Sequence, residues 1–132
     1  MKVYELSPSA IERMVPVDLA KLSAEPASPI GNFDFHGCIC GIASYSGQPP
    51  WELHDGGDEL LHVLAGQCDF TLLADGTKES RTLHAGDLAL VPRGHWHRTR
   101  AAQGVTLLFM TPREGSRHSW NDDPLARGTV AA

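Results

Sequence analysis

Four residues in this sequence have side chains and spacing that could form one chemical site. Glu52 and His54 are separated by one residue in a short strand-like segment, so both side chains point to the same face. A loop of four residues, two of them glycine, then turns the chain, and Glu59 opens the next apolar segment. His97 follows a turn that contains proline and glycine, and it begins another strand-like segment. The spacing therefore predicts that two imidazoles and two carboxylates converge.

This set of side chains suits a divalent first-row metal ion. Two histidines and one carboxylate can hold such an ion from one side and leave positions open for substrate or dioxygen. Because the set contains no thiolate, manganese, iron, nickel or zinc is favoured over copper(I). Glu52 has alternative roles as a fourth ligand, as a general base, or as a carboxylate paired with Arg93 or Arg98. The alternative for the whole set is a metal-free cluster held by hydrogen bonds.

The spacing resembles the two sequence motifs of the cupin family. The first motif has His-x-His, a Glu and a Gly in a fixed frame, which this chain fills with Glu52, His54, Glu59 and Gly66. The second motif has Gly, Pro-x-Gly and His in a fixed frame, which the chain fills with Gly86, Pro92, Gly94 and His97. The segment 67–85 between the motifs is long enough for a hairpin.

Three positions depart from the family pattern. Glu52 stands where the family has the first histidine, Ala101 where it has an asparagine, and Ser46 where it has a glycine. The usual ligands of the family are three histidines and one glutamate. The resemblance therefore implies a metal site made by His54, Glu59 and His97, with Glu52 as a harder fourth ligand or as a base beside the metal.

The local sequence patterns predict an all-β domain, and the resemblance implies that it is a double-stranded β-helix, or jelly-roll barrel. Short apolar or β-branched segments alternate with glycine, proline and Asp-Gly turns. We expect strands at 33–45, 51–54, 59–65, 68–73, 80–84, 88–91, 96–100 and 105–111. Helix is expected only near 9–22, with Ser9 as the cap of the first turn. The single domain divides into an N-terminal arm (1–32, with a connector at 23–29), a barrel (33–111) and a polar tail (112–132).

Composition excludes several functions. The 132 residues suffice for one domain, and a net charge of −5 argues against binding to nucleic-acid phosphates. No apolar stretch approaches the ~18 residues of a membrane helix. The odd number of cysteines (Cys38, Cys40 and Cys68) and the acidic start without a signal peptide predict buried, reduced thiols and a cytoplasmic location. Exposed sheet edges and the apolar segment 14–17 favour a homodimer.

The other aromatic and imidazole side chains have expected places outside the four-residue cluster. The histidines are predicted as follows: His95 at the rim, His62 on the opposite face of its strand, His36 as a structural residue on a long strand, His84 in solvent, and His118 in the tail outside the site. Trp51 and Trp96 flank the motif residues and could belong either to the pocket wall or to the core.

Three functions stay open on these patterns. The first is a metal-dependent enzyme in which the metal polarises a substrate oxygen and Glu52 moves a proton. For such an enzyme the resemblance to cupins implies a sugar isomerase, an epimerase, a dioxygenase or a decarboxylating enzyme. The second is a module that binds a small polar metabolite such as a sugar or a carboxylic acid without converting it. The third is a structural homodimer with a vestigial metal site. A helix-turn-helix segment for DNA binding is not present in the pattern.

Overall fold

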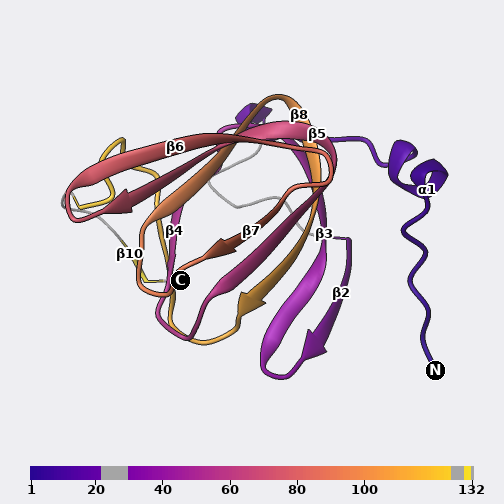
Figure 1. Cartoon of the computed structure of the whole chain (residues 1–132), viewed down its shortest axis with the longest axis horizontal. Helices are drawn as coiled ribbons and strands as arrows, with labels where there is room; N and C mark the ends of the chain where they lie inside the picture. The colour runs from indigo at the N-terminus through magenta and orange to yellow at the C-terminus, as the bar shows by residue number, and fades with distance from the viewer. Residues whose placement is uncertain (22–29, 126–129, 132) are drawn as a thin grey trace.

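The computed structural model describes residues 1–21, 30–125 and 130–131 and consists mainly of β-strands (Figure 1). The strands are β1 (Val17–Asp18), β2 (Ile30–Phe35), β3 (Cys38–Gly47), β4 (Trp51–His54), β5 (Glu59–Ala74), β6 (Thr77–His84), β7 (Leu88–Val91), β8 (His97–Pro112), β9 (Ser116–Ser119) and β10 (Val130–Ala131). Together they form a bent, jelly-roll arrangement that does not close into a continuous barrel. The predicted all-β class is confirmed.

The helical parts lie in the N-terminal arm, as expected, but the first helix is capped two residues earlier than predicted. Helix α1 covers Pro8–Glu12, and the Ser7 hydroxyl accepts a hydrogen bond from the backbone N–H of Ala10. Ser7 is the cap because the residue after it is proline, whose fixed φ and missing N–H suit the first helical position. A single 3₁₀ turn, η1, follows at Leu19–Lys21. The connector predicted at 23–29 lies outside the described residues.

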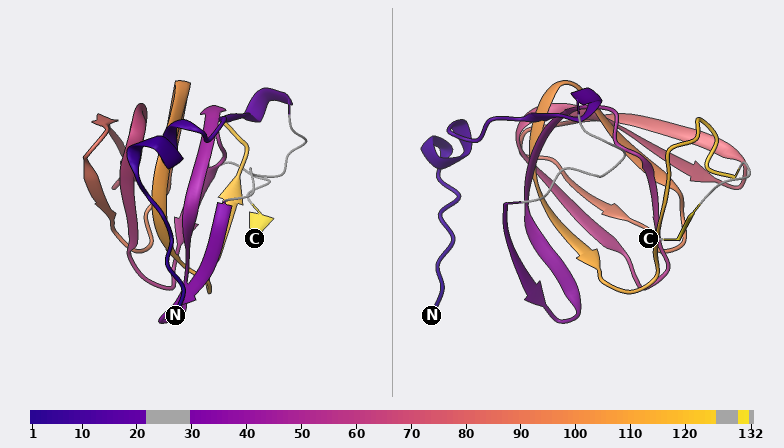
Figure 2. Two further views of the ribbon diagram at one scale, coloured as in Figure 1. Left: turned by 90° about the vertical axis from the view of Figure 1, so that its right-hand side faces the viewer. Right: turned by 180° about the vertical axis from the view of Figure 1, so that it is seen from behind.

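The long strands β5 and β8 organise the molecule. Each has 16 residues, and they pair antiparallel from Leu60 opposite Met110 to Leu72 opposite His97, with two irregularities in the register. The sequence predicted two strands in place of each, with a turn at Gly66 in β5 and a gap at 101–104 in β8. Gly66 and Gly104 both have positive φ, and a side chain at Gly66 would collide with the carbonyl of Gly104. They therefore mark bends within continuous strands, and these bends let both strands take part in two facing layers (Figure 2).

Two further strand predictions need correction. The expected strand 33–45 is interrupted by a turn at His36 and Gly37, so that β2 and β3 form a hairpin. His36 has a φ of +50° and is exposed, so it is not the structural residue on a long strand that was predicted. The region after Pro112, expected as a polar tail, contributes β9, which pairs antiparallel with β4.

The core consists of two clusters. The larger one lies between the layers and contains mainly aliphatic side chains, among them Leu61, Val63, Val105 and Leu107. The smaller one contains Trp51, Leu53 and Trp96. Both tryptophans therefore belong to the core, and neither lines the cavity described below. Since Trp51 and Leu53 pack on one face of β4, strand alternation turns Glu52 and His54 to the other face.

The cysteines, the N-terminal arm and the length of the helices complete the description of the fold. All three cysteines are free, and burial raises the pKa of the Cys68 thiol to about 11. Helix α1 lies at one end of the molecule beside β5, whereas β1 of the N-terminal arm pairs parallel with β3 (Figures 1 and 2). None of the helices in the described ranges has the length and apolar character that crossing a bilayer requires.

Candidate metal centre

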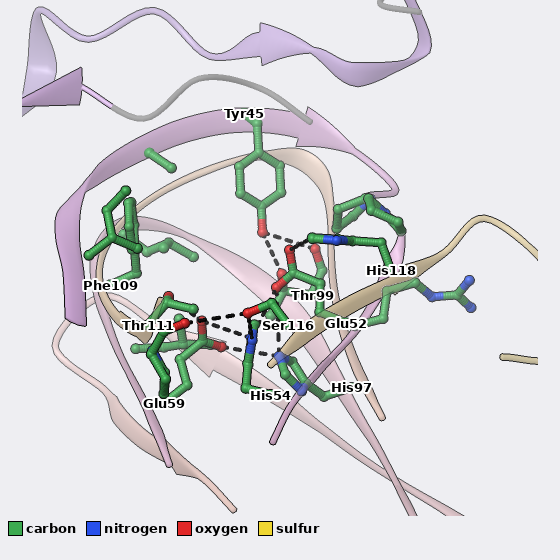
Figure 3. A pocket seen from close by; sticks show the side chains of 18 of the residues that line it. Tyr45, Glu52, His54, Glu59, His97, Thr99, Phe109, Thr111, Ser116 and His118 are labelled. Atoms are coloured by element: carbon green, nitrogen blue, oxygen red, sulfur yellow. Dashed lines mark hydrogen bonds and ion pairs between the residues drawn. The ribbon is translucent and has the colours of Figure 1, made fainter. Parts of the chain in front are cut away.

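The structure brings together all four residues of the predicted cluster. Glu52 and His54 lie on β4, Glu59 is the first residue of β5, and His97 is the first residue of β8. One ligand atom from each lies within 4.8 Å of one from every other (Figure 3). His54, Glu59 and His97 are almost fully buried, whereas the Glu52 side chain is 31% exposed. Glu52 is thus the member of the cluster nearest to solvent.

The distances within the cluster are short enough for a single ion. The Nε2 atom of His97 lies 3.1 Å from Oε1 of Glu59, and Nε2 of His54 lies 3.3 Å from Oε2 of the same carboxylate. The Oε2 atom of Glu52 lies 3.6 Å from Nε2 of His54 and 3.8 Å from Nε2 of His97. Two adjacent ligands that are each ~2.1 Å from one ion lie about 3 Å apart. The four side chains therefore need only small movements to share a metal.

Hydrogen bonds on the far side of each imidazole orient its lone pair toward the centre. Nδ1 of His97 donates to the carbonyl of His95 at 3.1 Å, and Nδ1 of His54 contacts Oγ of Ser116 at 2.8 Å. Because the Ser116 hydroxyl donates to the carbonyl of Pro112, its oxygen accepts the proton on His54. Both neutral rings then carry hydrogen on Nδ1 and present a bare Nε2, the form in which histidine binds a metal.

The acceptors of the centre require a cation between them. Nε2 of His54 is buried and has no hydrogen-bond partner among the described residues. In the neutral tautomer this nitrogen is a hydrogen-bond acceptor, and it faces the Glu52 and Glu59 carboxylates, which are also acceptors only. Either a proton or a metal ion must occupy the space between these groups. The residues present therefore fit a divalent metal ion.

The electrostatics of the metal-free cluster show the same need for positive charge. Burial by itself would lower the pKa of His54, but the Glu52 and Glu59 carboxylates raise it to about 9. Burial by itself would raise the pKa of Glu52, but the hydrogen bond with His118 and the nearby imidazole of His54 bring it far below its usual range. The pKa of Glu59 is likewise lowered, against burial, by His54 and His97. Both carboxylates therefore remain ionised and favour a cation beside them.

The prediction that His118 lies outside the site is wrong. On β9, His118 is paired in register with Glu52, and its Nε2 lies 3.2 Å from Oε1 of that carboxylate. The same ladder pairs Ser116 with His54. The partner predicted for Glu52, an arginine at position 93 or 98, is thus replaced by His118. The sequence did not reveal this strand because segment 116–119 is polar throughout. Its inward-facing side chains contact the polar cluster, so the strand has no apolar face.

Thr111 is a second residue that the sequence did not single out. Thr111 lies near the end of β8, and its hydroxyl donates a hydrogen bond of 2.5 Å to Oε2 of Glu59. Together with Ser116 and His118, it gives three of the four cluster residues a partner from the short segment 111–118. We call this segment the supporting segment. The side chains of His62 and His84 make no such contact, as predicted: His62 lies on the opposite face of β5 from the buried Leu61, and His84 is exposed.

A cavity of about 430 Å³ opens beside the cluster and is walled by β3, β4, β5, β8 and β9. Its size is within the range of ~300–1,000 Å³ typical of small-molecule sites. The cluster and His118 line one part of it, and aliphatic and aromatic side chains line another. The site therefore combines a candidate metal centre with room for an organic molecule.

Comparison with known proteins identifies the family. The model of the cupin domain family Cupin_2 matches residues 42–111, which include both predicted motifs, and the chain belongs to this family. The chain is 41% identical over 61 residues to the uncharacterized protein YdbB of Bacillus subtilis (strain 168), in a match that covers 46% of this chain and half the length of YdbB.

Solved structures share the fold. Protein NMB1881 from Neisseria meningitidis is 28% identical, with a TM-score of 0.56 over 71% of this chain and 91% of that one. A hydroquinone 1,2-dioxygenase, PnpCD in complex with Cd²⁺ and 4-hydroxybenzonitrile, is 19% identical, with a TM-score of 0.54 over 68% of each chain. At this identity, the second likeness concerns the fold alone.

Proposed function

We propose that this protein is a metal-dependent cupin enzyme that holds one divalent ion with Glu52, His54, Glu59 and His97. The observation that carries the proposal is the buried Nε2 of His54, which faces two ionised carboxylates without a hydrogen-bond partner among the described residues. Four protein ligands leave two positions of an octahedral site for substrate and a second small molecule. Manganese, iron, nickel and zinc are the candidate ions.

The reaction class that fits best is dioxygenation of a small organic substrate. A bound redox-active ion would supply activation of dioxygen and polarisation of a substrate oxygen. Glu59, His54 and His97 are buried and hydrogen-bonded, so they hold their positions, while Glu52 is the most exposed of the four and faces the cavity. We propose that Glu52 ligates through Oε2 and keeps its free oxygen on His118. The comparison protein PnpCD is a dioxygenase, which supports this class by analogy of fold.

Elemental analysis tests the metal centre. The protein is purified without added metal or chelator, and the expected result is about one divalent ion per chain. If the isolated protein contains none, it is incubated with manganese, iron, nickel and zinc in turn and analysed again. A chain that stays empty with every ion would show that Glu52 in place of histidine has abolished metal binding, and would overturn the proposal.

We also propose that the protein is a homodimer of the cytoplasm. Leu88 and Leu90 on strand β7 are 57% and 67% exposed, and β7 pairs only with β5 in the described part of the chain. The arm exposes further apolar side chains, including Val3 and Val15. A second copy that covers the β7 edge would bury both sets by symmetry. The free thiols fit a reducing compartment.

Light scattering tests the dimer. The unmodified protein should have twice the mass of the chain at micromolar concentration, and Leu90→Lys should yield monomers. Leu125→Lys is the matched control, because Leu125 is equally exposed (68%) on a different segment. A monomeric mass for the unmodified protein would contradict the proposal.

A further inference from the structure

The part of the cavity that faces away from the cluster is apolar. Ile39 and Ala43 line it from β3, Leu61 from β5, and Leu107 and Phe109 from β8. These strands are neighbours in the sheet, and the five side chains therefore form one continuous surface, the apolar wall. A molecule that fills the cavity must place most of its surface against this wall.

The hydroxyl groups around the cavity are already used by the protein. The Tyr45 hydroxyl donates to the carbonyl of Thr99 at 3.0 Å and lies 2.6 Å from the Thr99 hydroxyl. The Thr111 hydroxyl donates to Glu59, and the Ser116 hydroxyl joins His54 to the carbonyl of Pro112 (Figure 3). Every hydroxyl-bearing residue that lines the cavity therefore has an intramolecular partner. Of the two arginines that line the cavity, Arg113 is paired with Asp34 and Arg98 lies over the Trp51 ring. A sugar would therefore find few free groups to replace the water that its hydroxyls lose.

The charge of the centre also limits the ligand. The two ionised carboxylates, Glu52 and Glu59, balance the two positive charges of a divalent ion, and neutral His54 and His97 add none. The loaded centre is therefore uncharged as a whole. A dianionic ligand would gain no net attraction from the centre itself, whereas a neutral or weakly acidic oxygen donor does not depend on such attraction.

From these three observations we propose that the site takes a small apolar molecule, of about the size of one aromatic ring, that presents a phenol-type hydroxyl to the metal. The ring lies on the apolar wall, and the hydroxyl oxygen takes an open position at the ion. This inference rests on the proposed function, because it requires a metal in the cluster. It replaces the small polar metabolite that the sequence predicted, a sugar or a carboxylic acid, with a largely apolar ligand.

Calorimetric titration of the zinc-loaded protein tests this inference. The probes are 4-methylphenol, glucose and gluconate, and the metal content of every sample is measured alongside. We expect 4-methylphenol to bind at least about tenfold more tightly than either polyol. Glucose or gluconate binding as tightly as 4-methylphenol would overturn the inference while leaving the metal centre intact. A chain that holds no metal would overturn both proposals.

Two wall variants and one matched control locate the binding. Ile39→Asn places an amide on the apolar wall, and Ala43→Leu fills part of the cavity; each should weaken 4-methylphenol binding by about tenfold or more with one zinc retained. Ile42→Asn makes the same change on the face of β3 that points away from the cavity and should leave binding unchanged. Equal losses in the Ile39 and Ile42 variants, or full binding in both wall variants, would place the ligand elsewhere.

Discussion

The four-residue cluster and the supporting segment 111–118 are adjacent in space but differ in how they are encoded. The cluster residues come from β4, β5 and β8 and occupy fixed positions in two sequence motifs. Thr111, Ser116 and His118 follow no motif. Thr111 reaches the cluster from the end of β8, and Ser116 and His118 reach it because β9 pairs with β4. The cluster carries the candidate ligand atoms, whereas the supporting segment sets their orientation and hydrogen positions. Substitutions in the cluster should therefore abolish metal binding, whereas substitutions in the supporting segment should weaken it.

Replacing His97 with alanine should have the largest effect. In the proposed centre, His97 supplies one of two imidazole ligands from a buried position, so we expect stoichiometric metal to disappear in elemental analysis. The gain in melting temperature that a tightly bound ion confers on the unmodified protein should disappear with it. The matched control is His95→Ala, which removes a half-buried imidazole two residues away but keeps the carbonyl that orients His97. Full metal occupancy in the His97 variant would place the site elsewhere.

The second largest effect should come from pH. Because the carboxylates raise the pKa of metal-free His54 to about 9, a metal ion must displace a proton from this ring at neutral pH. The apparent affinity for zinc should therefore fall by about tenfold for each pH unit below 9. Competition with a chromophoric chelator between pH 6 and pH 9 measures this slope, and a flat profile would contradict it.

The same shift predicts the opposite trend for the stability of the metal-free protein. The pKa of His54 is higher in the folded state than its ordinary value of 6.5. Its contribution to stability is therefore fully present below pH 6.5 and is lost as pH rises through about 9. Urea unfolding of metal-free protein should show a falling free energy of unfolding across this interval. Saturating zinc should reduce or reverse the fall.

Removal of the Ser116 hydroxyl tests the supporting segment. Ser116→Ala leaves Nδ1 of His54 without its acceptor, so the ring is no longer held with Nε2 toward the metal. We expect zinc affinity to fall by about 10- to 100-fold, which is the usual effect of losing a partner of a metal-bound histidine. Ser116→Thr keeps the hydroxyl and should restore most of the affinity. Equal affinities in all three proteins would show that the supporting segment does not orient His54.

The cluster was predictable from sequence because its signals are local. Alternation on a short strand places Glu52 beside His54, and the second motif fixes the position of His97 relative to its turn. Gly66 was misleading, since a turn and a bend within a strand both require positive φ. The error at His36 was the reverse, since a continuous strand was predicted where the chain turns. The apolar pattern of 33–45 conceals this turn, which only Gly37 signals.

His118 could not be predicted because its position depends on a pairing between distant segments. A strand that faces solvent on one side and a polar site on the other lacks the alternation of apolar and polar residues by which strands are recognised. Ser116–Ser119 has no apolar residue, and its register with β4 is visible only in the folded chain. The residues that tune a site can thus be less visible in sequence than those that form it.

Replacement of His118 should have the smallest effect and discriminates between two roles of Glu52. The His118 ring is partly exposed and contacts Oε1 of Glu52, while the other oxygen faces the cluster. If the bond positions Glu52 as a ligand, His118→Ala should lower zinc affinity by up to about tenfold, and His118→Gln, which still donates a hydrogen bond, should restore it. Glu52→Gln should then weaken zinc binding more than His118→Ala does. If Glu52→Gln instead binds zinc as tightly as the unmodified protein, Glu52 is not a ligand, and its carboxylate acts as a base beside the metal.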